Sequence, residues 1–385
     1  MLEIDTMDAL VDWLRDGEQP EPAALQGLDL LESSAPLLRS RPRGSIFLGC
    51  ALAPEVAAHL VGAGAIVLPN IPAVSFQVHR SRLYPPEDLF GGFDPRDPEG
   101  YLKTLDARIY REYLEQGGAT PASILVTLAR RLHDHSISDA LEEAIEGRRV
   151  VAMMGGHGME RSDPFYAQVA RISRTLTRRG FLMVSGGGPG AMEATHLGAY
   201  FAPRQDGDLL AALELMSSRP PGAPRGKEYA DADWLHRAWR VLECFPVPEG
   251  RRREAESIGI PTWLYGHEPP SPFATHLAKY FANAVREDGL LAIARHGVIF
   301  APGSAGTTQE IFQDAAQNHY ATTGFVSPMI LVGTSYWTRT RPVWPLLESV
   351  AQGQRFAELL ALTDDEDEII HRIVEYDPEE YRRQG

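Results

Sequence analysis

A glutamate lies about one turn into a predicted helix whose start is rich in small residues. The stretch "FAPGSAGTTQEIFQ", residues 300–313, follows the apolar run "GVIFA", which predicts a buried strand. Backbone N–H groups at a helix start favour an anion, usually phosphate. Here those N–H groups come with small side chains and hydroxyls, at Gly303, Ser304, Ala305, Gly306 and Thr307. The sequence therefore predicts that this loop holds a phosphate.

Glu310 is the acidic residue close to this predicted phosphate site. A carboxylate aimed at the phosphate would be repelled, so we expect it to point toward whatever the phosphate is attached to. Beside a ribose it could stabilise positive charge at the anomeric carbon and activate a water, which is the chemistry of glycosidic bond cleavage. The alternative is that Glu310 only complements the macrodipole in the first turn of its own helix. The spacing alone favours neither interpretation.

A second glycine loop, "SGGGPGAMEA", follows another apolar run. Gly186, Gly188 and Ala191 match the dinucleotide fingerprint G-x-G-x-x-G/A. The acidic residue that this fingerprint expects about 20 residues later would fall at residues 206–208, where a helical insertion begins. We therefore favour a mononucleotide over NAD, held by N–H groups at Gly187, Gly188 and Gly190. The alternative is a tight turn that needs positive φ and close helix packing.

Apolar runs that end in glycine alternate with amphipathic stretches from Arg149 onward. Strands are expected at 150–156, 181–188, 260–265, 298–303 and 327–337, and helices at 164–180, 189–201, 275–297 and 342–353. This alternation predicts an α/β fold, a doubly wound Rossmann-like parallel sheet with helices on both faces. Residues 206–253 form a helical insertion, in which the Pro/Gly-rich segment 218–231 is expected to be a loop or lid.

The first 147 residues have a different sequence pattern from the core at 148–385, and we interpret them as an appended N-terminal α/β domain. They contain one short β–α–β pattern, at 45–70, and then turn-rich and helical segments. Nothing in their sequence indicates what they bind.

Composition excludes several classes of protein. The chain has 385 residues, 44% of them hydrophobic, and a formal net charge of −15, which argues against a broad nucleic-acid surface. Two cysteines are too few for a disulfide framework or a cysteine-based metal site. The N-terminal segment is acidic and amphipathic rather than signal-like, and no apolar run reaches the ~20 residues that span a bilayer. We therefore expect a cytoplasmic protein without membrane contact.

The two glycine loops together resemble the LOG ("lonely guy") family, nucleoside 5′-monophosphate phosphoribohydrolases once labelled lysine decarboxylases. The family pattern PGGxGTxxE is matched at Pro302, Gly303, Gly306, Thr307 and Glu310, with Ser304 in place of the second glycine. "EPPSPFATHL" and "GGGPGAMEA" are most similar to the larger bacterial nucleosidases that act on purine and pyrimidine 5′-monophosphates. The resemblance covers residues 148–376 and implies that Glu310 is catalytic, with Arg286 on the preceding helix as its partner.

The resemblance also implies ligand contacts elsewhere. Gly155 and Gly156 in "MGGHGMERSDP" would admit a base or phosphate, and His157 beside them could contact the ligand. Met192 and Glu193 are candidate ribose or base contacts, although Met192 is also explained by core packing. Glu193 stands where LOG proteins often have glycine, so base preference does not carry over.

The expected activity is hydrolysis of the N-glycosidic bond of a nucleoside 5′-monophosphate, giving free base and ribose 5-phosphate. Candidate substrates are AMP, CMP, GMP, UMP and a cytokinin riboside monophosphate. The chemistry needs no metal or redox cofactor, and the resemblance implies a homodimer or higher homo-oligomer. Two alternatives remain open: a non-catalytic nucleotide-binding regulatory protein, motivated by the N-terminal domain, and an NAD-dependent oxidoreductase.

Overall fold

The computed structural model describes residues 1–15, 20–71, 74–97, 99–217 and 227–382. The chain divides into two compact units. The first comprises Met1–Leu83 and Arg111–Ala144, and the second comprises Tyr84–Tyr110 and Ile145–Gly385. This division differs from the predicted boundary at residue 147 because Tyr84–Tyr110 belongs to the second unit. The strands of the described residues form two sheets, one of four strands and one of seven.

The first unit contains a small parallel sheet in the order β1-β2-β3-β4. Its strands are β1 (Leu2–Ile4), β2 (Ala23–Gln26), β3 (Ile46–Leu48) and β4 (Ile66–Leu68), connected by α1 (Met7–Leu14), α2 (Ser34–Arg39) and α3 (Pro54–Gly62). The predicted β–α–β pattern at 45–70 is confirmed as β3, α3 and β4. Leu10, Leu25, Phe47 and Leu60 lie in its apolar core and are fully buried.

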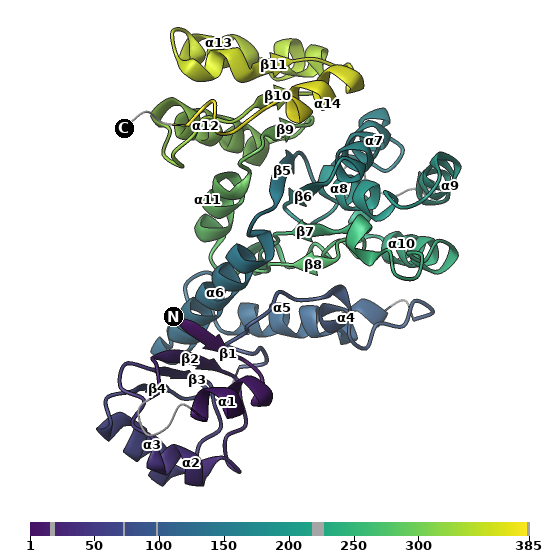
Figure 1. The fold of residues 1–385 in the computed structure, drawn as a ribbon. Coiled ribbons are helices and arrows are strands. Elements are labelled where there is room, and N and C mark those ends of the chain that lie inside the picture. Colours follow the sequence, from purple (N-terminus) through teal and green to yellow (C-terminus); the bar gives the residue numbers. More distant parts are fainter. Residues whose placement is uncertain (16–19, 72–73, 98, 218–226, 383–385) are drawn as a thin grey trace. The chain divides into compact units, whose positions relative to one another are not determined.

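The second unit is a doubly wound α/β fold, as predicted. Its parallel strands run in the order β11-β10-β9-β5-β6-β7-β8 (Figure 1). They are β5 (Arg149–Met154), β6 (Phe181–Ser185), β7 (Ser257–Gly259), β8 (His276–Leu277), β9 (Val298–Phe300), β10 (Met329–Leu331) and β11 (Leu360–Leu362). The chain builds outward from β5 to β8 on one side and then returns to place β9 against β5. This reversal makes a topological switch point between β5 and β9.

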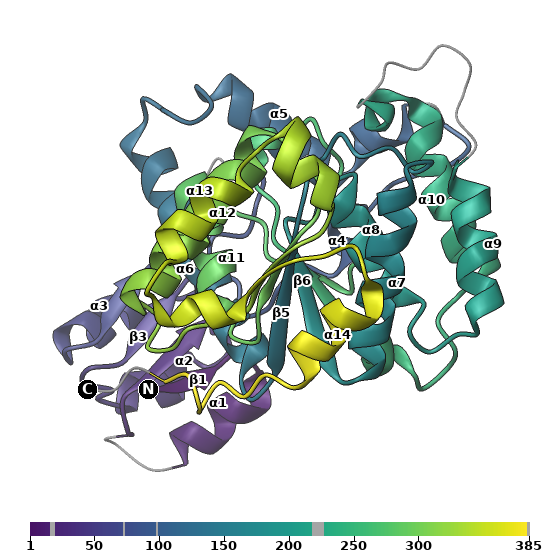
Figure 2. The ribbon, with the colours of Figure 1, turned by 90° about the horizontal axis from the view of Figure 1, so that it is seen from above.

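Helices cover both faces of this sheet, as Figure 2 shows from above. On one side lie α7 (Pro164–Arg178), α8 (Ala191–Tyr200) and α14 (Glu366–Val374), and on the other α11 (Asn283–Ile293), α12 (Ala305–Tyr320) and α13 (Trp344–Ala351). The main core lies between the sheet and the first group, where Val151, Met153, Tyr166, Leu197 and Ile299 are inaccessible to solvent. Burial on both faces explains why these strands read as continuous apolar runs.

Two predicted elements are wrong. The expected strand at 260–265 is instead a short 3₁₀ turn, Trp263–Tyr265, because Pro261 has no N–H for a sheet and Thr262 Oγ1 accepts a hydrogen bond from the Leu264 N–H (3.1 Å). The true strand, β7, lies just before it. The expected helix at 275–297 begins only at Asn283, because His276 and Leu277 pair with β7 instead. Sheet pairing overrides the helical pattern at that point.

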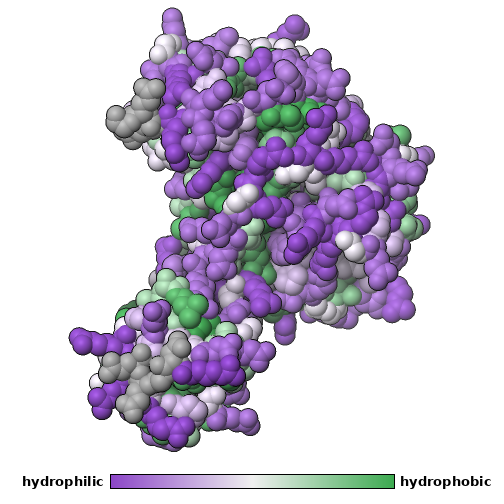
Figure 3. Space-filling view, in the orientation of Figure 1, coloured by the Kyte–Doolittle hydropathy of each residue, from purple (hydrophilic) through white to green (hydrophobic). Residues whose placement is uncertain are grey.

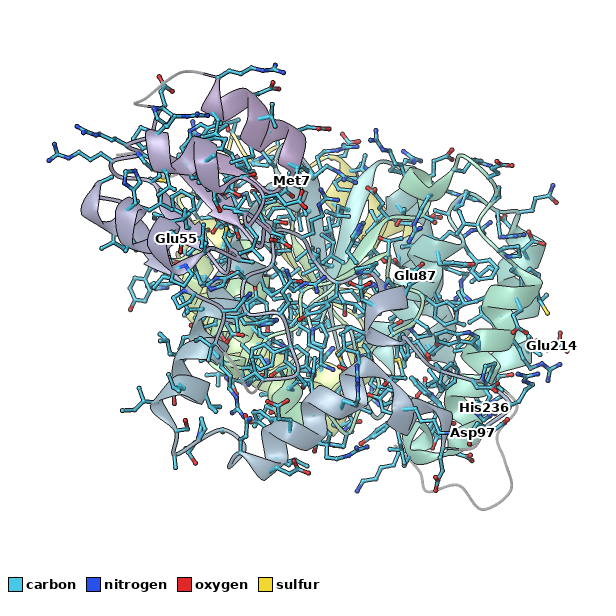
Figure 4. All side chains as sticks on the ribbon, turned by 90° about the horizontal axis from the view of Figure 1, so that it is seen from below. Met7, Glu55, Glu87, Asp97, Glu214 and His236 are labelled. Atoms are coloured by element: carbon cyan, nitrogen blue, oxygen red, sulfur yellow. The ribbon has the colours of Figure 1, made fainter. Side chains whose placement is uncertain are left out.

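The predicted helical insertion is present as α9 (Asp206–Ser217) and α10 (Ala232–Cys244). In Figure 4, Glu214 of α9 points outward at its edge, and this side chain is exposed. Most of the predicted loop at 218–231 lies outside the described residues. The segment Tyr84–Tyr110 packs against α10, where Phe90 contacts Trp239 with ring centroids 4.9 Å apart.

Candidate active site

Three loops meet at the carboxyl ends of the adjacent strands β9, β5 and β6. The Gly156 N–H donates to the Pro302 carbonyl (3.1 Å), and the Ala191 N–H donates to the Gly156 carbonyl (3.2 Å). The loop after β5 is therefore hydrogen-bonded to the loops on either side of it. The carboxyl ends of strands at a switch point are where open α/β sheets bind ligands.

Several predicted site glycines are required by the packing of these loops. A Cβ at Gly303 would overlap Thr307 Oγ1 and lie 2.9 Å from the Gly156 nitrogen. Gly187 and Gly190 have φ values of 72° and 70°, and a Cβ at Gly190 would overlap the Gly156 carbonyl oxygen. The alternative interpretation of a tight turn with positive φ thus describes part of what these residues do. Gly155 is equally constrained, because a Cβ there would lie 2.5 Å from Ala191 Cβ.

The two helix starts differ in their access to solvent. Gly187, Gly188 and Gly190, which precede α8, are buried, and Gly187 accepts a hydrogen bond from the Ser271 N–H (2.8 Å). Ser304, Ala305 and Gly306, at the start of α12, are exposed, and the side chain of the N-cap residue Ser304 makes no capping hydrogen bond. A Cβ at Gly306 would meet no atom within 4 Å. The start of α12 therefore offers open N–H groups to an anion.

Glu310 and Arg286 face each other from neighbouring helices. Arg286 Nη1 on α11 lies 3.7 Å from Glu310 Oε1 on α12, and the two residues are only 7% and 9% exposed. Burial raises the pKa of Glu310 to about 7; Arg286 opposes this rise and Glu287 adds to it. A carboxyl group with this pKa can exchange a proton near neutral pH.

The alternative role for Glu310, in the macrodipole of its own helix, is not supported. No acidic residue lies in the first turn of α12, which begins at Ala305. The effect of the dipole falls off within the first turn. The Glu310 carboxyl is instead buried against a neighbouring helix.

Arg286 is held against the glycine loop after β6. A Cβ at Gly186 would lie 3.3 Å from Arg286 Nη2 and 2.5 Å from Met192 Sδ, so the absence of a side chain there makes room for both. Within the described residues, Arg286 Nε has no hydrogen-bond partner. A buried guanidinium whose nearest carboxylate contact is 3.7 Å away retains donors for an anionic ligand. Met192 is half-buried beside it, so it both packs the loop and borders the site.

Glu193 does not reach the site. Its carboxylate is fully buried and accepts two hydrogen bonds from Arg161 (2.8 and 2.6 Å) and one from the Tyr166 hydroxyl (2.7 Å). With its oxygens occupied, Glu193 is a structural residue, and its predicted contact with a ribose or base finds no support in this geometry. At residues 206–208, where the dinucleotide fingerprint would place its acidic residue, Asp206 forms an ion pair with Arg174 (2.7 Å) at the start of α9.

Glu268 lies at the site, although the sequence pattern alone did not single it out. A Cβ at Gly188 would lie 3.3 Å from Glu268 Oε2 and 3.1 Å from Met192 Cε. The Glu268 side chain is 11% exposed, and His157 Nδ1 is 3.7 Å from its carboxylate. Burial raises the pKa of Glu268, against the opposing charges of His267, Arg286 and Lys279. The two prolines that follow it, Pro269 and Pro270, were the available signal for a fixed carboxylate.

Comparisons with known proteins add little to this geometry. No protein-family model and no curated protein matches the sequence. Among solved structures, the chain is similar to a molybdenum cofactor binding protein from the phototrophic bacterium Rippkaea orientalis, at 13% identity and a TM-score of 0.35, over 59% of this chain and 95% of that one. A likeness this weak supports no conclusion about the site.

In the described part of the chain, no helix is long and apolar enough to cross a bilayer. Among the same residues, no three His, Cys, Asp or Glu side chains gather so that they could hold a metal ion.

Proposed function

We propose that the second unit hydrolyses the N-glycosidic bond of a nucleoside 5′-monophosphate, releasing free base and ribose 5-phosphate. The observation that carries this proposal is the buried Glu310 carboxyl opposite Arg286, one turn beyond the open start of α12. The resemblance of the two glycine loops to LOG proteins supports the same activity.

The proposed ligand position follows from the geometry of α12. A phosphate at the N–H groups of residues 304–307 would be about 6 Å along the helix axis from Glu310, at 1.5 Å per residue. The ribose would then lie beside the Glu310 carboxylate, between α12 and the loop after β6. Arg286, with free donors, would hold either the phosphate or the sugar hydroxyls.

The proposed reaction passes through an oxocarbenium-like transition state. As the bond from C1′ to the base nitrogen breaks, the Glu310 carboxylate stabilises the positive charge on the sugar. It then accepts a proton from the water that attacks C1′. Arg286 keeps part of the Glu310 population ionised near neutral pH, because its charge opposes the rise in pKa.

A product assay tests this proposal. The chain is incubated with AMP, CMP, GMP, UMP and a cytokinin riboside monophosphate, and the free base and ribose 5-phosphate are separated and quantified. We expect release from at least one nucleotide and a fall of roughly 10²–10³-fold or more in Glu310→Gln. Glu348→Gln, an exposed change on α13, serves as the matched control and should keep full activity.

The second candidate is a nucleotide-binding regulatory protein without turnover. It is favoured by the first unit, a separate α/β unit with its own core that the proposed chemistry does not use. Nucleotide binding by the unaltered chain with no base release from any of the five substrates would support this candidate and contradict the hydrolase.

A further inference from the structure

Glu268 carries a second, largely buried carboxyl group at the site, with a side chain that is 11% exposed. Arg286 Nη2 and Met192 Sδ border Gly186, and Met192 Cε and Glu268 Oε2 border Gly188. Arg286 also pairs with Glu310. Arg286 and Met192 therefore lie between residues 186–188 of the glycine loop and contacts to each of the two carboxyl groups. Enzymes that break glycosidic bonds commonly use two carboxyl groups.

Ring side chains gather around the Glu268 carboxyl. His157 Nδ1 and His267 Nε2 lie 3.7 and 3.9 Å from Glu268 Oε1. The ring centroid of Tyr229 is 6.0 Å from that of His157 and 6.3 Å from that of His267. About half of each histidine side chain is exposed (46% and 54%), so these rings can meet a ligand. Flat rings around a hydrogen-bonding group suit a flat, polar heterocycle such as a nucleobase.

Lys279, one of the cations whose charge acts on Glu268, is held by a buried carboxylate. The Lys279 ammonium donates to Asp106 (2.6 Å), and the Trp263 N–H and Tyr101 hydroxyl donate to the same carboxylate (3.0 and 2.6 Å). Lys279 and Asp106 are 1% and 0% exposed. Lys279 thus pairs with Asp106, and its charge opposes only part of the effect of burial on Glu268. Burial is the largest effect and raises the pKa of Glu268, which favours its protonated form.

We propose that Glu268 is the acid that protonates the departing base, and that His157, Tyr229 and His267 form the wall against which this base stacks. This inference rests on the proposed hydrolysis. The electron pair of the bond from C1′ to the base nitrogen passes to the base, which takes the proton of the Glu268 carboxyl. Water adds to C1′ and gives its proton to Glu310. Exchange with solvent then restores both carboxyl groups, so the net reaction consumes one water.

Position rather than pKa separates the two roles. Burial raises the pKa of both carboxyl groups, that of Glu310 to about 7, so each can exchange a proton. Glu310 pairs with Arg286 near the start of α12, where the phosphate and sugar are proposed to lie. Glu268 lies beside the rings of His157 and His267, where the base is proposed to lie.

A substrate whose leaving group needs no proton tests the role of Glu268. We would measure Glu268→Gln and Glu310→Gln on the preferred nucleotide and on 4-nitrophenyl riboside 5-phosphate, whose phenolate departs unprotonated. Glu268→Gln should lose about 10²–10³-fold on the nucleotide but less than about 10-fold on the nitrophenyl substrate. Glu310→Gln should lose activity on both. Glu243→Gln, an exposed change on α10, should lose it on neither.

Two results would overturn the inference while leaving the hydrolase intact. One is a Glu268→Gln variant that cleaves the nucleotide at nearly the normal rate. The other is an equal loss on both substrates, which would assign Glu268 to ligand positioning or folding. If the unaltered chain cleaves neither substrate, the proposed function fails and the acid role falls with it. A titration with free adenine then still tests whether His157, Tyr229 and His267 bind a base, because Tyr229→Ala should weaken adenine binding by at least about threefold.

Discussion

Glu310 illustrates how burial turns an ordinary acid into a group that titrates near neutrality. Its ionised form is disfavoured because its side chain is only 11% exposed and Arg286 Nη1 is 3.7 Å away rather than at hydrogen-bond distance. Such a site costs folding stability, as functional sites often do. The cost has a definite dependence on pH.

The pKa of Glu310 rises from 4.5 to about 7 on folding, so the folded chain binds this proton more tightly than the unfolded chain. The corresponding stability is complete below about pH 4.5 and is lost as the pH rises through about 7. Glu310→Gln has no such loss, so it should become more stable than the unaltered chain by up to about 3 kcal/mol at pH 8, with little difference at pH 4.5. Urea unfolding at both values measures this, with Glu348→Gln as the control. A stability difference that does not change with pH would contradict the assignment.

Arg161 and Glu193 form a buried ion pair that we expect to be structural only. Their side chains are 2% and 0% exposed. Arg161→Ala should cost about 3–5 kcal/mol, because it leaves the Glu193 carboxylate buried without its cation. The double variant Arg161→Met/Glu193→Gln should recover part of this loss in chemical unfolding. A single variant of normal stability would show that Glu193 is relaxed or protonated and available for other contacts.

At the scale of elements, the start of α12 combines one glycine required by packing with one that meets open space. Gly303→Ala should destabilise the chain by at least about 1 kcal/mol, because its Cβ has no room beside Thr307 and Gly156. Gly306→Ala should keep or slightly raise stability, because the methyl group meets no atom and alanine favours the helix.

The Gly306→Ala variant also tests where the phosphate binds. If the phosphate occupies the open space at the start of α12, the new methyl group in Gly306→Ala should weaken the binding of ribose 5-phosphate at least several-fold. Calorimetric titration of this well-folded variant makes the measurement. Unchanged affinity would move the phosphate away from Gly306.

Much of the order of strands and helices in the second unit is predictable from the sequence, because a doubly wound sheet consists of buried apolar strands that alternate with amphipathic helices. The strands at 150–156, 181–188 and 298–303 were confirmed, as was the helix at 164–180. Residues 275–282 are not helical, although their apolar spacing suits a helix, because the pairing of His276 and Leu277 with β7 is a long-range contact that a local pattern does not contain.

The site divides in a similar way. Glu310, Arg286 and the glycine loops are predictable from the sequence, because the loops are short local patterns and the motif around Glu310 resembles that of the LOG family. The sequence assigned Glu193 to the ligand because nothing local shows that Arg161, 32 residues earlier, takes both carboxylate oxygens. A local pattern does not single out Glu268 as an acid, because its burial and its contact with the loop after β6 arise only in the fold.

At the scale of the whole molecule, the segment Tyr84–Tyr110 belongs with the second unit although it precedes part of the first in sequence. Asp106 of this segment binds Lys279, Phe90 packs against Trp239, and Tyr84 forms a β-bridge with Leu277 of β8. The second unit is therefore not a continuous piece of chain.

The visible surfaces of both units are mostly hydrophilic (Figure 3), in keeping with a net charge of −15.

A truncated chain tests this division. Residues 145–385 alone would leave Lys279 buried without its carboxylate and expose the aromatic side of α10. We expect this fragment to unfold at markedly lower urea than the full chain, or not to fold, because an unpaired buried charge alone costs about 3–5 kcal/mol. A fragment as stable as the full chain would show that Tyr84–Tyr110 is dispensable to this unit.

The most direct test of the account is a crystal structure of Glu310→Gln with a bound nucleoside 5′-monophosphate. We predict that the phosphate accepts hydrogen bonds from N–H groups at residues 304–307 and that the substituted side chain at position 310 lies within about 4 Å of C1′. The base should lie against His157 and Tyr229. A nucleotide bound elsewhere, or one whose sugar faces away from residue 310, would contradict the claim that Glu310 acts on the glycosidic bond.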